Sequence, residues 1–125
     1  MPEMFTGAFF DELVKTLNND AEFKNKTASV NATVLMVNRD TKKSYLLTIE
    51  KGAAKWVEGN EETKADFTFI GDTPTWVSNH KGEITMEKAI MTGKLKFKGS
   101  LPKIMGMRSQ LVVIDQLAQK IPTDA

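Results

Sequence analysis

The spacing of apolar residues changes twice along this chain, and these changes constrain the fold more than any other feature of the sequence. Near the N-terminus, Phe10, Leu13, Val14 and Leu17 recur at the i, i+3, i+4, i+7 positions of a helix. This spacing predicts an amphipathic helix over residues 6–18. Its apolar stripe must be covered by another element of the fold.

Between residues 30 and 70 the apolar residues alternate with polar ones, which is the period of a β-strand. Four short runs show this alternation, and turn residues such as those of NRDTKK separate them. In the first run, Val30, Ala32, Val34 and Met36 share one face, and Leu35 and Val37 lie on the other. The second run carries Tyr45, Leu47 and Ile49, the third Trp56 and Val57, and the fourth Phe67 and Phe69. The first run is apolar on both sides, which predicts a strand covered on both faces. The hairpin-like links predict an antiparallel meander of these four strands.

Helical spacing returns after residue 70. The residues GDTP at 71–74 combine a helix-capping side chain with a proline that suits the first helical turn. The expected elements are a short helix carrying Trp76 and Val77, a second from Thr85 to Gly93, a strand over residues 94–98, and a long amphipathic helix from Ser100 that bends at Gly106.

Composition excludes several kinds of site. The chain has no cysteine, so it can form neither a disulfide nor a thiolate metal site. Its single histidine, His80, lies at a polar helix end, where a histidine commonly faces the last carbonyls. We therefore expect no metal, no cofactor and no catalytic residue. The 17 basic and 16 acidic residues leave a net charge of +1, which does not favour a nucleic-acid partner.

Length and hydropathy lead to expectations about organisation. With 125 residues, 41% of them hydrophobic, the chain is expected to form one domain over residues 1–125. No stretch approaches the roughly 18 uninterrupted apolar residues of a membrane span, and the first residues lack the apolar core of a secretory signal. We therefore expect a cytoplasmic protein that is a monomer or a weak dimer.

Lysines alternate with apolar residues in KLKFK, residues 94–98. In a strand the lysines share one face and Leu95 and Phe97 share the other, so we expect a solvated edge strand rather than a site for a polyanion. More widely, residues 81–108 hold seven basic residues and two acidic ones, a net charge of +5. This excess predicts a transient contact with an anionic membrane, since each basic residue near such a surface contributes about 1 kcal/mol.

The stretch ADFTFIGDTPTWVSNHKGEITMEKAIMTGKLKFKGS, residues 65–100, resembles the sterol carrier protein type 2 (SCP-2) lipid-transfer family. In that family an Ala-Asp-x-Thr strand is followed by a short helical region and then by a Gly-Lys-Leu-Lys strand that ends in glycine. The corresponding residues here are Ala65, Asp66 and Thr68, then Gly93, Lys94, Leu95, Lys96 and Gly99. The order of the expected elements is also similar to that family over about residues 6–120.

The resemblance implies an α/β (α+β) fold with a five-stranded, mainly antiparallel curved sheet, covered by helices that enclose an apolar tunnel. It also implies a non-enzymatic carrier of a long-chain lipid, which could be a fatty acid, an acyl-CoA, a phospholipid or a sterol. On this basis we expect the tunnel to be lined by Val34, Met36 and Leu47 of the sheet, by Trp76, Val77, Ile90 and Met91 of the short helices, and by Met105, Leu111 and Ile114 of the last helix.

Two side-chain types in this set have a chemical reason to be there. Met91 and Met105 have unbranched, polarisable side chains that adapt to ligands of different shape, although methionines on amphipathic helices are also common core residues. Arg108 is the eleventh residue expected at the tunnel. It lies at the expected bend of the last helix and is the candidate for holding a carboxylate head group at the tunnel entrance.

Two other functions remain open from the sequence. The first is a small isomerase or dehydratase on a curved sheet, which would use Asp66 as a buried carboxylate with a raised pKa beside an apolar pocket. The second is an accessory or dimerisation module, in which the C-terminal amphipathic helix covers a partner instead of a ligand.

Overall fold

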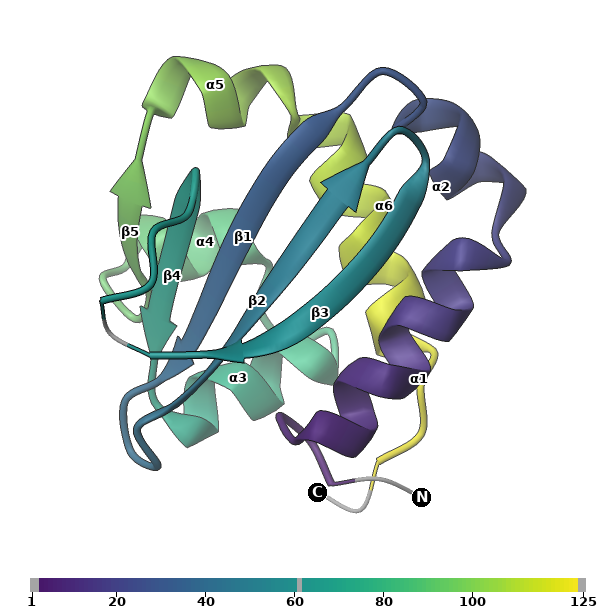
Figure 1. The fold of residues 1–125 in the computed structure, drawn as a ribbon. Coiled ribbons are helices and arrows are strands. Elements are labelled where there is room, and N and C mark those ends of the chain that lie inside the picture. Colours follow the sequence, from purple (N-terminus) through teal and green to yellow (C-terminus); the bar gives the residue numbers. More distant parts are fainter. Residues whose placement is uncertain (1–2, 61, 124–125) are drawn as a thin grey trace.

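The computed structural model describes residues 3–60 and 62–123 and arranges them as one mixed sheet with helices (Figure 1). The elements are α1 (Gly7–Asn18), α2 (Ala21–Lys26), β1 (Asn31–Asn38), β2 (Lys43–Glu50), β3 (Ala53–Gly59), β4 (Phe67–Gly71), α3 (Thr73–His80), α4 (Met86–Met91), β5 (Lys96–Gly99), α5 (Leu101–Gly106) and α6 (Arg108–Gln119). Among the described helices, none is long and apolar enough to cross a membrane.

The five strands lie in the order β3-β2-β1-β4-β5. Three of the four pairings are antiparallel, so the prediction of a mainly antiparallel sheet is confirmed. The prediction of a four-stranded meander is wrong, because β4 does not pair with β3. It crosses the sheet and pairs with β1, in parallel.

A polar contact holds β4 beside β1. The carboxylate of Asp66, just before β4, accepts hydrogen bonds from the backbone N–H of Thr33 at 2.9 Å and from its hydroxyl at 3.3 Å. In return, the Thr33 hydroxyl oxygen accepts from the backbone N–H of Asp66 at 2.8 Å. Periodicity cannot show this pairing, because it depends on two residues that are 33 positions apart.

The sheet presents one apolar face to the helices, and α1, α3, α4 and α6 lie against that face in Figure 1. The strand register brings together the side chains that point to this inner face. They are Ala32, Val34, Met36, Tyr45, Leu47, Ile49, Ala54, Trp56, Phe67, Phe69 and Phe97. The outer face of β1 is also covered, because Leu35 and Val37 are buried and Gly59 lies against the Leu35 side chain. The strand covered on both faces is therefore confirmed.

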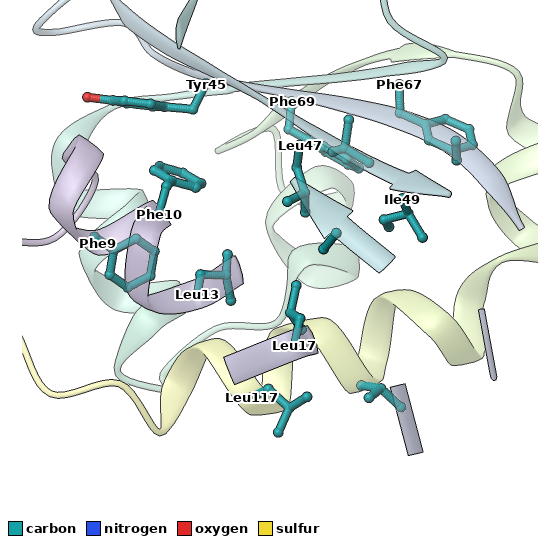
Figure 2. Packing of buried hydrophobic residues seen from close by; sticks show 14 of the residues in the cluster. Phe9, Phe10, Leu13, Leu17, Tyr45, Leu47, Ile49, Phe67, Phe69 and Leu117 are labelled. Atoms are coloured by element: carbon teal, nitrogen blue, oxygen red, sulfur yellow. The ribbon is translucent and has the colours of Figure 1, made fainter. Parts of the chain in front are cut away.

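The stripe of α1 fills the space beneath the inner face at one end of the sheet (Figure 2). Phe10 stacks on Tyr45 with ring centroids 4.4 Å apart, and Phe9 meets Phe10 edge to face. Further along α1, Leu13 and Leu17 are buried. Each such side chain contributes about 1.5–3 kcal/mol when fully buried, so α1 is a fixed part of the cover.

The helical segments differ in detail from the sequence expectation. Asp72 caps α3 by accepting from the backbone N–H of Thr75 at 2.9 Å, so Thr73 is the first helical residue and Pro74 the second. The long C-terminal helix is two helices, because α5 ends at Gly106 and α6 begins at Arg108. The expected bend is thus a break at Met107, whose side chain is buried.

The lysine-rich strand β5 forms one edge of the sheet, as expected for a solvated strand. Lys96 and Lys98 are exposed, whereas Leu95 is buried and Phe97 is half-buried. The lysines therefore face solvent and do not contribute to what the apolar side contacts.

Candidate functional site

An apolar cavity of about 100 Å³ lies between the inner face of the sheet and the helices. The described residues that line it come from the segment before α1 and from α1, β1, β2, β4, α3, α4 and α6. They are Met4, Phe5, Phe9, Phe10, Leu13, Val34, Met36, Leu47, Phe69, Trp76, Asn79, His80, Met86, Leu111, Ile114, Asp115 and Ala118. All but three of these side chains are apolar, so the wall suits a hydrocarbon chain.

The structure brings together six of the eleven residues expected at the tunnel. Val34, Met36 and Leu47 line the cavity from the sheet, Trp76 lines it from α3, and Leu111 and Ile114 line it from α6. Trp76 is fixed there because its indole N–H donates to the carbonyl oxygen of Val37 at 3.0 Å.

The other five lie outside the cavity. The side chains of Val77 and Ile90 are half-buried, and Ile90 packs against the core. Met91 and Met105 are 79% and 72% exposed, so neither is part of the wall. The sequence predicts their place on short helices but not the direction of their side chains.

Arg108 also lies on the surface. Its guanidinium donates to the Glu87 carboxylate at 2.7 Å, which links the start of α6 to the start of α4. Both side chains are more than half exposed, so this pair contributes at most about 1 kcal/mol to stability. The structure therefore pairs Arg108 with a carboxylate of the chain itself.

Sequence reasoning missed two groups of lining residues. The first is the aromatic cluster around α1, Phe5, Phe9 and Phe10, which periodicity identifies only as a stripe that must be covered. The second is polar and consists of Asn79 and His80 at the end of α3 and Asp115 on α6. The sequence does contain a signal for the second group, because Asp115 lies between Ile114 and Ala118 on the apolar stripe of α6.

Asp115 lies at the cavity wall, where its side chain is partly buried. Burial raises the pKa of Asp115 to about 6, although hydrogen bonds from Asn79 and Gln119 oppose this shift. The Gln119 amide nitrogen lies 3.4 Å from the Asp115 carboxylate.

His80 is 9% exposed and lies edge to face with Phe9. Its Nε2 is 2.9 Å from the carbonyl oxygen of Ile121, just past the end of α6. Its Nδ1 is buried and has no hydrogen-bond partner among the described residues. The sequence predicts a histidine that faces carbonyls of its own helix end, but His80 bonds to a carbonyl beyond the end of another helix.

Asp66 does not fit the role of a catalytic carboxylate. That role requires a raised pKa, whereas the hydrogen bond from the Thr33 backbone and the nearby Lys103 ammonium lower the pKa of Asp66. Asp66 also does not line the apolar cavity. Among residues 3–60 and 62–123, no three His, Cys, Asp or Glu side chains are grouped to hold a metal ion.

The SCP-2 sterol transfer family model matches residues 10–111, which span the sheet, most of the cavity wall and the start of α6. The chain belongs to this family. The SCP-2 resemblance of residues 65–100 is thus confirmed over a much longer part of the sequence. A comparison with curated protein sequences finds no significant match.

Solved structures share the fold of this SCP-2 family member. A crystal structure of sterol carrier protein 2 matches with a TM-score of 0.78 and 23% identity, over 96% of this chain and 100% of that chain. A protein from Thermus thermophilus, described as possibly a sterol carrier protein, matches with a TM-score of 0.78 and 21% identity, over 98% and 94%. Palmitated SCP2L2 from Aedes aegypti matches with a TM-score of 0.58 and 10% identity, over 87% and 95%.

The raised pKa of Asp115 predicts that this carboxylate destabilises the fold at neutral pH. The folded chain holds the Asp115 proton more tightly than the unfolded chain, where the pKa is 3.8, so stability falls as pH rises from about 4 through 6. Asp115→Asn should therefore be the more stable protein above pH 7, by up to about 3 kcal/mol, with the smallest difference near pH 4.

Urea unfolding of both proteins from pH 4 to pH 8 measures this difference, and Glu12→Gln, at an exposed position of α1, controls for the loss of one negative charge. A difference between Asp115→Asn and the unsubstituted protein that does not change with pH would contradict the prediction.

Proposed function

We propose that this SCP-2 family member is a non-enzymatic carrier that holds one long-chain lipid in the apolar cavity between its sheet and its helices. The observation that supports this proposal is the wall itself. Fourteen of the seventeen described lining residues are apolar, and they come from both the sheet and the helices. The description of one structural relative as palmitated supports an acyl chain as the kind of ligand.

The energetics suit a carrier. Burying a sixteen-carbon chain at about 0.8 kcal/mol per methylene gives roughly 12 kcal/mol, against about 4–15 kcal/mol lost on association. A bilayer offers the chain an equally apolar environment, so transfer between the bilayer and the cavity changes the free energy little. This balance allows both uptake and release.

The cavity must widen to take such a ligand, because about 100 Å³ is less than the roughly 300–1,000 Å³ of small-molecule pockets. The cover is weakest at α4, where Ala89 is the only fully buried residue of the described helix. The side-chain contacts near α4 include the exposed Glu87–Arg108 pair and the hydrogen bond from the Asn79 amide to the carbonyl of Ile84, just before the helix. Segments with few buried contacts open at the lowest free energy, so we propose that α4 is the part of the cover that moves.

Filling the cavity with a protein side chain should exclude the ligand. Ala118 lines the cavity from α6, and Ala118→Phe places a ring where the acyl chain would lie. We expect lipid affinity to fall at least about tenfold, because the lost chain contacts exceed about 1.4 kcal/mol. Displacement of the neutral fluorescent probe N-phenyl-1-naphthylamine measures this affinity.

Ala8→Phe is the matched control, since Ala8 is exposed on α1 and does not line the cavity. Equal affinity of Ala118→Phe and Ala8→Phe, with both proteins folded, would place the ligand elsewhere.

We further propose that loading and release occur during a transient contact with an anionic membrane through residues 81–108. This segment has a net charge of +5 and includes α5, which has no fully buried residue. Leu101 and Met105 lie one helical turn apart on α5 and are 61% and 72% exposed. In sequence, Lys98 precedes both and Lys103 lies between them. Exposed apolar side chains beside lysines match the interface of an anionic bilayer.

Removing these two apolar side chains should weaken membrane contact without unfolding the protein. Leu101→Ser/Met105→Ser is expected to reduce binding to phosphatidylserine vesicles at least about fivefold, because each burial in the interface is worth around 1 kcal/mol or more. Vesicle flotation measures the bound fraction. Val57→Ser is the control, because Val57 is 55% exposed on β3 at the opposite edge of the sheet. Equal loss in both proteins would contradict a docking role for α5.

A further inference from the structure

Part of the cavity wall is polar, and the hydrogen-bonding groups left free there are acceptors. Asn79 and His80, at the end of α3, line the cavity together with Asp115 of α6, which hydrogen bonds to Asn79. A ligand that fills the cavity with a hydrocarbon chain can place its end group among these three residues. The chemistry of that end group follows from what the three side chains can still donate or accept.

The contacts of His80 assign its donor and acceptor. The carbonyl oxygen of Ile121 can only accept, so the hydrogen of the neutral imidazole lies on Nε2, which is 2.9 Å away. Nδ1 then carries a lone pair and can only accept. It is buried, in a side chain at the cavity wall, and has no partner among the described residues. A buried acceptor without a partner costs free energy that a ligand with a donor recovers.

The other two residues add acceptors and leave little donor capacity. The Asn79 amide donates to the Ile84 carbonyl at 3.1 Å and also hydrogen bonds to Asp115. At a pH of about 7.5, Asp115 is mainly ionised, since its pKa is about 6, and a carboxylate only accepts. The end group must therefore bring a donor, and a second negative charge beside Asp115 is unfavourable.

We propose that the cavity of this protein selects neutral long-chain lipids whose end group is a hydroxyl, which donates to His80 Nδ1, while the Asp115 carboxylate disfavours an anionic end group. This inference rests on the proposed function and narrows its ligand class. It excludes ionised fatty acids as the preferred ligand. The place of Arg108 agrees with this, because the arginine is paired with Glu87 on the surface and no arginine is among the described residues that line the cavity.

Three ligands with the same chain test the proposal: dodecan-1-ol, dodecyl methyl ether and dodecanoate, each measured at about pH 7.5 by displacement of N-phenyl-1-naphthylamine. We expect the alcohol to bind about tenfold more tightly than the ether. Only the alcohol has an O–H group that can donate to the buried acceptor, and a hydrogen bond to such an acceptor contributes a free energy of this size or more. We expect dodecanoate to bind more weakly than the alcohol as well.

Two variants test the roles of Asp115 and His80. Asp115→Asn removes the charge and adds an amide donor, so the affinity for dodecanoate should rise about tenfold while that for the alcohol changes little. His80→Phe keeps an aromatic ring against Phe9 and should remove the preference of the alcohol over the ether. Glu12→Gln controls for the net charge and should change none of the three affinities.

The outcomes separate the inference from the proposed function. If the unsubstituted protein binds all three ligands equally, or binds dodecanoate most tightly, the inference is wrong and the carrier function stands. If none of the three displaces the probe, the carrier function fails and the inference fails with it. If His80→Phe does not fold, the Asp115→Asn result decides, and an unchanged preference against dodecanoate in that variant would overturn the proposal.

Discussion

Burial of the inner face of the sheet is the interaction on which the other features of this structure depend. The strands place a continuous apolar surface on one side, and α1 covers one end of it with stacked aromatic rings such as Phe10 on Tyr45. The helices α3, α4 and α6 cover the rest. Together with α1 they do not fill the space against the sheet completely, and the cavity is the result. A cavity of this kind needs no sequence motif, since it is the incompletely filled part of the core.

Because the cavity wall is mainly apolar, the few polar side chains in it indicate what kind of ligand the cavity could hold. Polar side chains at an apolar wall cost free energy unless they are hydrogen-bonded. Asp115 and His80 lie at such a wall, and the pKa of Asp115 is raised to about 6 as a consequence. A sequence selected for stability alone would place apolar residues at both positions. Their presence there is the reason for proposing that they meet the end group of a ligand.

Much of the fold could be predicted from periodicity, because α1, α6 and the strands show their own repeats, whereas the short helix α2 was not expected. The parallel pairing of β4 with β1 could not, since it rests on the contact between Asp66 and Thr33, 33 residues apart. Six residues expected at the tunnel do line the cavity, because alternation and helical spacing show which side chains face inward. Met91 and Met105, which were also expected there, do not line the cavity. Short helices such as α4 and α5 bury at most one residue fully, so their sequences do not fix which face points inward.

In the proposed function the cavity opens to hold one lipid per chain, and native mass spectrometry of the freshly purified protein tests this most directly. We expect a mass increase that corresponds to one lipid, which organic extraction would release and identify. A protein of unmodified mass that also fails to bind N-phenyl-1-naphthylamine would contradict the claim, and would mean that the cavity is only an imperfection of the core.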